Sequence, residues 1–103
     1  MFSRVNFLET APERIDDVAR VVREVVHPGI SGEAGYRGYV VLGDRATGKA
    51  LGVTLWDSEE AREASDAKAR TIRPQVEEGT GATMRSVERY EVLFYDVKPE
   101  PAQ

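Results

Sequence analysis

The stretch YRGYVVL-GDRATGK-ALGVTLW, residues 36–56, decides the fold of this chain. Residues 36–42 and 50–56 are rich in β-branched and aromatic side chains, which favour strands. Residues 43–49 between them contain Gly, Asp and Thr, which favour a turn. The stretch therefore predicts a β-hairpin, and the other elements can be placed on either side of it.

The N-terminal residues 2–9 predict a further strand, because polar and apolar side chains alternate around Arg4 and Asn6. Phe2 and Leu8 break this alternation, since they share the parity of the two polar residues. The strand therefore has no purely polar face.

A helix is expected between this strand and the hairpin. Thr10 can act as its N-cap, with Glu13 at the spacing of a capping box. We expect the helix to end at His27, because Pro28 disfavours helical geometry at the residue before it. Its apolar stripe consists of Ile15, Val18, Val22 and Val25, with Ala19, Val21 and Val26 beside them.

A second helix and a last strand follow the hairpin. Asp57 or Ser58 can cap the helix, which should run to about Arg73 and be interrupted or kinked at Pro74. Its inward stripe would consist of Ala61, Ala64, Ser65 and Ile72. Residues 78–81 predict a loop, and residues 84–97 predict a long final strand.

The element order β-α-β-β-α-β predicts a ferredoxin-like α+β fold. In this fold two helices cover one face of a four-stranded antiparallel sheet. We expect one domain over residues 1–97 and a flexible C-terminal tail over residues 98–103.

The uncovered face of the sheet is expected to need a partner. The strands at residues 36–42 and 84–97 carry apolar side chains at both odd and even positions, and therefore on both faces. Strands of this kind are usually covered on both faces. The simplest arrangement is a homodimer through the open sheet face. The alternative is that the tail or a loop covers this face.

Composition narrows the class of protein. The net charge of -4 gives no reason to expect nucleic acid or an anionic membrane as partner. No apolar run approaches the roughly 20 residues of a membrane span, and the N-terminus lacks the apolar segment of a signal peptide. The chain has no cysteine and a single histidine, His27, which excludes disulfides and a multi-histidine metal site within one chain. We therefore expect a cytoplasmic protein without a metal.

Several motifs together resemble a known family. They are GYRGY at residues 35–39, DRATGK at 44–49, LWDSEEA at 55–61 and ERYEV at 88–92. In this order they look like the antibiotic biosynthesis monooxygenase (ABM) family. The resemblance implies a dimeric α+β barrel with a ligand cavity between the helices and the sheet of each subunit. It also implies either cofactor-independent oxidation of aromatic polyketide intermediates or haem degradation, the activities of characterised members.

Trp56 is the first candidate site residue. It shares its strand face with Gly52 and Thr54, so its indole can roof a hollow left by these small residues. The alternative is a tightly packed core tryptophan. The resemblance implies that a tryptophan at this strand-helix junction lines the cavity.

Asn6 is the second candidate. A buried amide needs hydrogen-bond partners, and in a cavity it can hold a substrate oxygen or an O2-derived species. A purely structural amide is the alternative. In haem-degrading relatives, a similar asparagine and tryptophan accompany a histidine on the second helix. The comparable residues Ser65, Asp66 and Ala67 include no histidine, so no haem cofactor is expected.

His27 is the third candidate, as the only imidazole and hence the obvious general base. At a helix end it can equally serve a capping role. Arg70 and Arg73 can bind a carboxylate or phenolate, or can simply be solvated. The four tyrosines can line either the cavity or the dimer contact.

The sequence thus predicts a cofactor-independent ABM-type monooxygenase acting on a small aromatic or quinol-like substrate. Its catalytic candidates are Asn6, Trp56 and His27. The alternative is a non-catalytic dimeric protein that binds a ligand or has a structural role on the same scaffold.

Overall fold

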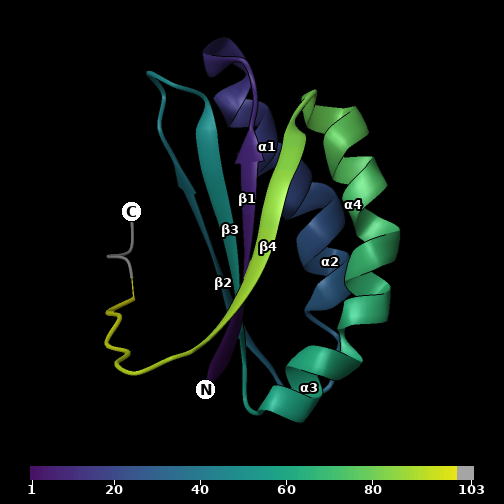
Figure 1. Cartoon of the computed structure of the whole chain (residues 1–103), viewed down its shortest axis with the longest axis vertical. Coiled ribbons are helices and arrows are strands. Elements are labelled where there is room, and N and C mark those ends of the chain that lie inside the picture. Colours follow the sequence, from purple (N-terminus) through teal and green to yellow (C-terminus); the bar gives the residue numbers. More distant parts are fainter. Residues whose placement is uncertain (100–103) are drawn as a thin grey trace.

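A computed structural model describes residues 1–99 as a four-stranded antiparallel sheet with helices on one face (Figure 1). The strand order is β2-β3-β1-β4, which confirms the ferredoxin-like α+β fold. The strands are β1 Phe2–Glu9, β2 Tyr36–Gly43, β3 Lys49–Trp56 and β4 Thr83–Glu91.

The predicted hairpin is confirmed, and each of its strands is one residue longer than expected at the turn. Asp44 organises this turn: its backbone N–H donates to the Lys49 carbonyl at 2.8 Å, and its side chain accepts from the Ala46 N–H at 2.8 Å. Gly48 follows with a φ of 81°, a left-handed conformation that favours glycine. The turn thus fixes the register of β2 against β3.

The first helix has four consecutive segments with different geometry. A 3₁₀ turn, η1, comes first, and a π-helical turn, η2, separates α1 from α2. The bounds are η1 Pro12–Arg14, α1 Ile15–Val21, η2 Val22–Val26 and α2 His27–Ile30. The capping role predicted for Thr10 is wrong, because its hydroxyl donates to the Thr80 carbonyl at 2.9 Å and Ala11 occupies the N-cap.

The predicted helix end at His27 is also wrong, since the helix continues to Ile30. Pro28 lies in the first turn of α2, where a missing N–H is tolerated. The wider π-helical turn before it sets a five-residue step between two buried residues, Val21 and Val26. A regular α-helix would have turned one of them away from the sheet.

The second helix is divided into α3 Glu59–Ala64 and α4 Asp66–Thr80. The predicted cap at Ser58 is confirmed, because its hydroxyl accepts from the Ala61 N–H at 3.1 Å. The break lies at Ser65, whose hydroxyl donates back to the Arg62 carbonyl at 2.6 Å.

The predicted helix end near Arg73 and the predicted loop at residues 78–81 are both wrong. Pro74 lies inside α4, which continues through it. The helix extends to Thr80, through residues expected to form a loop, and Gly81 ends it with a φ of 66°. The left-handed glycine therefore terminates this helix, and the proline does not.

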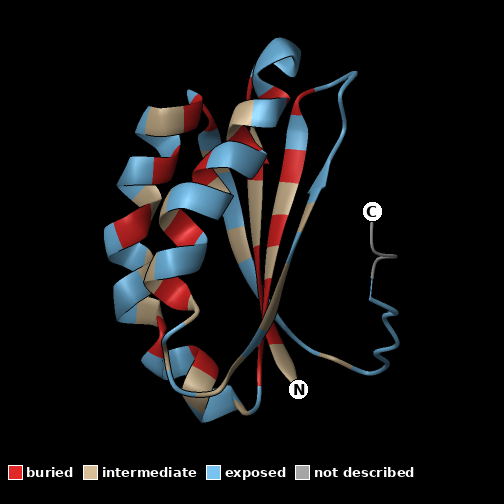
Figure 2. Ribbon diagram, turned by 180° about the vertical axis from the view of Figure 1, so that it is seen from behind, coloured by how far each residue is buried: buried red, intermediate tan, exposed pale blue. Residues whose placement is uncertain are grey.

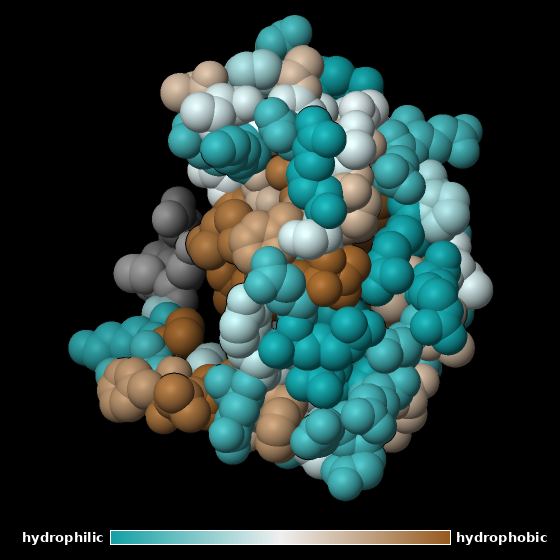
Figure 3. All heavy atoms as spheres, viewed as in Figure 1, coloured by the Kyte–Doolittle hydropathy of each residue, from teal (hydrophilic) through white to brown (hydrophobic). Residues whose placement is uncertain are grey.

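The last strand is shorter than predicted, because β4 ends at Glu91. Beyond it, the Val92 N–H still donates to the Met1 carbonyl at 2.8 Å, but β1 offers no further partner. Residues 92–99 leave the sheet without regular structure (Figure 1). Figure 3 shows hydrophobic residues on this segment at the lower left. In the segment, Leu93 is 89% exposed and Phe94 is 85% exposed. Of the predicted tail, residues 100–103 lie outside the described residues.

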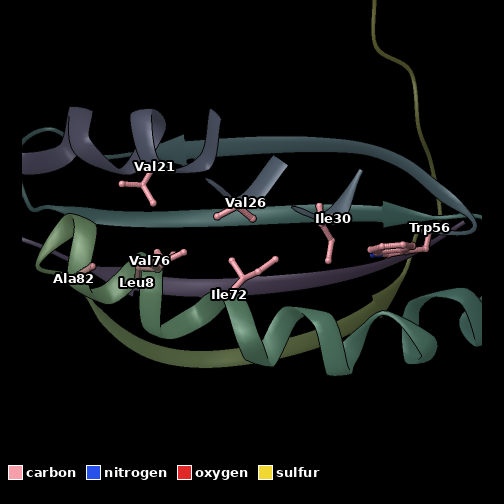
Figure 4. Packing of buried hydrophobic residues seen from close by; sticks show 8 residues of the cluster. All are labelled: Leu8, Val21, Val26, Ile30, Trp56, Ile72, Val76 and Ala82. Atoms are coloured by element: carbon pink, nitrogen blue, oxygen red, sulfur yellow. The ribbon is translucent and has the colours of Figure 1, made fainter. Parts of the chain in front are cut away.

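The core fills the layer between helices and sheet. Figure 2 shows buried residues recurring along the helices and the central strands, where these layers meet. Its larger cluster consists of Leu8, Val21, Val26, Ile30, Trp56, Ile72, Val76 and Ala82 (Figure 4). A smaller cluster consists of Ile15, Val18 and Ala50. Over residues 1–99, no helix is both long and apolar enough to cross a membrane.

Candidate functional site

A cavity of about 40 Å³ lies in this layer, between the helices and the sheet. Most of its wall is apolar, and five side chains give it polar groups: Arg4, Asn6, Tyr39, Thr54 and Arg73. The other lining residues are Leu8, Val18, Val22, Val26, Ile30, Val41, Gly52, Ala69, Ile72, Val76 and Met84.

Asn6 lines this cavity from β1. Its Nδ2 lies 3.5 Å from the Gly52 carbonyl, a weak hydrogen bond at best. Its Oδ1 is buried and has no hydrogen-bond partner within the described chain. The structure therefore places Asn6 where a ligand could supply the missing donor.

Trp56 is completely buried and lies at one end of the core row, beside Ile30 (Figure 4). Its Nε1 donates to the Thr54 hydroxyl at 2.9 Å, and its ring packs edge-on against Tyr36 at 5.8 Å between centroids. The indole is not part of the cavity wall, although Gly52 and Thr54 of the same strand are. The hollow beside the small residues therefore exists, and Trp56 packs at the end of the layer.

His27 lies apart from both. Its side chain is exposed and contacts the ring of Tyr36 edge-on, at 6.1 Å between centroids. It does not line the cavity. The structure thus places Asn6 in the cavity wall, together with Gly52 and Thr54 from the strand of Trp56. Trp56 itself packs in the same layer, and His27 lies outside it.

Arg4 is the site residue that the sequence interpretation missed. It is 1% exposed, and its Nη1 donates to the Arg62 carbonyl at 3.3 Å, the Ser65 hydroxyl at 2.8 Å and Asp66 Oδ1 at 2.9 Å. Its guanidinium also lies over the Trp56 ring, 5.6 Å from the centroid. The signal was present in β1, because the residues that share its parity, Phe2 and Leu8, are apolar.

Positive charge exceeds negative charge around Arg4. Asp66 binds Arg4 and also accepts from Arg89 Nη2 at 3.2 Å. Burial is the main factor that lowers the pKa of the Arg4 and Arg73 guanidinium groups, and Asp66 partly offsets it. Arg73 lines the cavity and is half-buried, whereas Arg70, the other predicted anion ligand, is exposed.

The tyrosines and the small helical residues have separate roles. Tyr39 lines the cavity, and burial raises its pKa to about 12. Tyr36 packs against the core, while Tyr90 and Tyr95 are each 51% exposed. Of the predicted inward stripe of the second helix, Ala64 is exposed.

The size of the cavity limits what it can hold in this conformation. An engineered protein cavity that binds benzene measures about 150 Å³, and a single water needs roughly 10–15 Å³. A cavity of about 40 Å³ therefore accommodates one small polar group. A ring requires movement of half-buried wall residues such as Arg73 and Met84, whose side chains are long and flexible.

The polar groups in the wall are two guanidinium groups, one amide and two hydroxyls, and carboxylates are absent from it. Within residues 1–99, no group of three or more His, Asp or Glu side chains is arranged to hold a metal ion. The arrangement can hydrogen-bond and electrostatically stabilise an oxygen-bearing ligand.

Comparisons with known proteins agree with this architecture. The model of the antibiotic biosynthesis monooxygenase family matches residues 1–71. An uncharacterised protein of Mycobacterium tuberculosis is 32% identical over 92 residues, which cover 89% of this chain but only 41% of that protein. The chain thus spans less than half the length of this relative.

Solved structures share the fold at low sequence identity. A provisionally assigned antibiotic biosynthesis monooxygenase of Deinococcus radiodurans has a TM-score of 0.69 and 17% identity, covering 98% of this chain and 100% of that one. The ActVA-Orf6 monooxygenase of Streptomyces coelicolor, solved with the ligand nanaomycin D, has a TM-score of 0.68 and 14% identity, covering 96% and 92%. At these identities the likeness concerns the fold.

Proposed function

Because this chain belongs to the antibiotic biosynthesis monooxygenase family, we propose that it is a cofactor-independent monooxygenase acting on a small aromatic or quinol-like substrate. The observation that carries this proposal is the apolar cavity between the helices and the sheet. Asn6 gives this cavity a buried oxygen without a hydrogen-bond partner.

The proposed reaction requires no external reductant. The substrate carries a CH₂ group between two rings, and a carbonyl or phenol group on these rings makes it acidic. This CH₂ loses a proton, and the resulting carbanion passes one electron to O2. The carbon radical and superoxide then combine to a peroxide, which takes up a proton and loses water to leave a carbonyl. One CH₂ and one O2 thus give one C=O and one H2O. The protein has to bind the anion, exclude bulk water and supply a route for the proton.

The three candidate residues have different parts in this proposal. Asn6 contacts a substrate oxygen directly from the cavity wall. Trp56 is a positioning residue, because its indole supports the guanidinium of Arg4. His27 remains the candidate proton acceptor as the only imidazole, although its exposed ring reaches the core only across Tyr36.

Oxygen uptake with anthrone as the substrate tests this proposal. We expect Asn6→Ala to lower the rate by about ten-fold, the value of one lost hydrogen bond from a substrate O–H to the Asn6 Oδ1, and Trp56→Phe to lower it less. Arg23→Ala, an exposed change on the π-helical turn away from the cavity, is the matched control. A rate that is unchanged in Asn6→Ala and Trp56→Phe would contradict the site, and an unchanged rate in His27→Ala would remove His27 from it.

A second candidate function is binding without oxidation. It is favoured by the absence of an imidazole or carboxylate from the cavity wall. Wild-type protein that binds aromatic ligands yet consumes no O2 with anthrone or related quinols would support this candidate over the monooxygenase.

We also propose that two copies pair through the open sheet face. Tyr39 and Val41 pack on the helical side, so Val40 and Leu42 between them point to the opposite face. These two side chains are 41% and 51% exposed. Together with the projecting apolar segment at residues 92–97 (Figure 3), they offer a hydrophobic surface that a second copy could cover.

A further inference from the structure

Three unsatisfied polar atoms belong to residues around the same cavity. In the described chain, four buried side-chain nitrogen or oxygen atoms lack a hydrogen-bond partner. Arg4 Nε, Asn6 Oδ1 and Arg73 Nε belong to residues of the cavity wall, and only Arg62 Nε does not. A buried polar atom without a partner destabilises a fold, so the concentration of these atoms around one cavity suggests a ligand that satisfies them.

The chemistry of these atoms indicates what the ligand carries. Arg4 Nε and Arg73 Nε are donors, so they require an acceptor, whereas Asn6 Oδ1 requires a donor. The guanidinium groups of Arg4, Arg73 and Arg89 share one nearby carboxylate, that of Asp66. Arg73 forms no ion pair within residues 1–99. The acceptor that best compensates this surplus is therefore negatively charged.

We infer that the cavity binds an anionic oxygen, held by Arg4 and Arg73, on a hydroxylated apolar ligand whose O–H donates to Asn6 Oδ1. The shared chemistry is that of an aromatic carboxylate or a phenolate. This inference deepens the proposed function and rests on it only in taking this cavity as the ligand site.

The apolar wall and the volume are consistent with this ligand class. Ile72, Val76 and Met84 offer no hydrogen bond to the body of the ligand, so an uncharged ring fits beside the charged end. The cavity of about 40 Å³ accommodates the oxygen-bearing head group, and the ring requires Met84 or Arg73 to move. A water molecule would also fit, but it would leave the positive charge uncompensated.

Arg73 provides the sharpest mutational test, because it is half-buried and its replacement spares the buried Arg4–Asp66 pair. The probe is salicylate, with neutral salicylamide as its isosteric counterpart, and isothermal titration calorimetry measures the dissociation constants. We expect salicylate to bind at least about ten-fold more tightly than salicylamide, and Arg73→Gln to remove that difference. Arg70→Gln, an exposed change of equal charge on the same helix, should preserve it.

Two outcomes of this titration would overturn the inference for a carboxylate. One is equal affinity for salicylate and salicylamide in the wild type. The other is an equal loss of the preference for salicylate in Arg73→Gln and Arg70→Gln. Such a loss would indicate that the overall positive charge of the helix attracts the anion without a specific site. A further readout needs no variant: the Nε–H resonance of Arg4 should shift in NMR spectra on adding salicylate, while that of exposed Arg20 should not.

The phenolate form is tested with 4-nitrophenol, whose ionised form is yellow. Two guanidinium groups favour the ionised phenol, so wild-type protein should increase the yellow absorbance at a pH below the ordinary pKa of the probe, and Arg73→Gln should not. A response to salicylate alone assigns a carboxylate, and a response to 4-nitrophenol alone assigns a phenolate. No response to either overturns the inference.

These measurements separate the inference from the proposed function. Anion binding without O2 uptake would contradict the monooxygenase and leave the anion site in place. Oxidation of neutral anthrone without any preference for anions would do the reverse.

Discussion

Tyr39 connects a single partly buried side chain to the stability of the protein. Burial is the main factor that raises the pKa of its phenol to about 12, from a usual value of about 10. At a pH below about 10 the phenol is neutral in both folded and unfolded chains. Between pH about 10 and about 12, the unfolded chain ionises while the folded chain stays neutral, so the free energy of unfolding falls as the pH rises.

We therefore expect the wild type to lose about 2 kcal/mol more stability than Tyr39→Phe between pH about 8 and about 12. Urea unfolding followed by circular dichroism across this range measures the difference. Tyr95→Phe, which changes a phenol of the projecting segment, is the control and should lose stability as the wild type does. Equal pH profiles for wild type and Tyr39→Phe would show that the Tyr39 phenol is not responsible.

At the scale of residues, the sequence predicted part of the site. The prediction that small residues on the strand of Trp56 leave a hollow agrees with the position of Gly52 and Thr54 in the cavity wall. Arg4 was not predicted, because a charged residue in an alternating strand pattern is usually assigned to the solvent-facing side. Its burial depends on Asp66 and Ser65 of a different element, and local periodicity contains no information about such long-range partners. The catalytic roles of Asn6, Trp56 and His27 stay predictions.

At the scale of elements, the hairpin turn depends on Gly48. An added Cβ at this position would lie 1.9 Å from the Thr10 carbonyl oxygen, and the φ of 81° disfavours any larger residue. The same Gly48 accepts through its carbonyl from the Thr10 N–H at 2.9 Å. The turn and the end of β1 are thus packed backbone against backbone.

Gly48→Ala should therefore lower the free energy of unfolding by about 2 kcal/mol or more. Gly32→Ala is the matched control, because a Cβ there meets no atom within 4 Å and its φ is not positive. Its effect should stay within about 0.5 kcal/mol. Chemical denaturation of both variants measures the contrast, and similar losses in the two would contradict the role of the turn.

Element types were predictable where each element has its own local signal. The cap at Ser58 and the hairpin turn are encoded by side chains that bond to their own backbone neighbours. Helix ends were less predictable, because Pro28 and Pro74 indicate ends that packing overrides. The π-helical turn at Val22–Val26 preserves the contact of both helix halves with the sheet, which is a tertiary requirement.

At the scale of the molecule, the order of elements was sufficient to predict the fold, since few topologies accommodate β-α-β-β-α-β. The length of the last strand was not predictable from one chain. Residues 92–97 have strand-like composition, but strand pairing needs a neighbour, and β1 begins at Phe2. In the proposed dimer, a second copy could supply that neighbour.

The proposed dimer gives a prediction at this scale. We expect wild-type protein to sediment as a dimer, and the double variant Leu93→Asp, Phe94→Asp to associate about 100-fold more weakly. Each of these side chains contributes about 1.5–3 kcal/mol when buried, and both are exposed in the single chain. Sedimentation equilibrium measures the association constant.

Asp96→Ala, in the same segment, is the control for this experiment and should leave association unchanged. A wild type that stays monomeric at all concentrations would contradict the dimer and favour cover of the open face by the tail or a loop.

The hydrogen bond from the Val92 N–H to the Met1 carbonyl places the beginning and the end of the folded part of the chain side by side. Two copies could therefore be joined in tandem through the C-terminal segment without cutting through either sheet. Such a fusion would replace an encounter between molecules by one within a single polypeptide, at a local concentration set by the linker. Pairing would then no longer depend on how much protein is present.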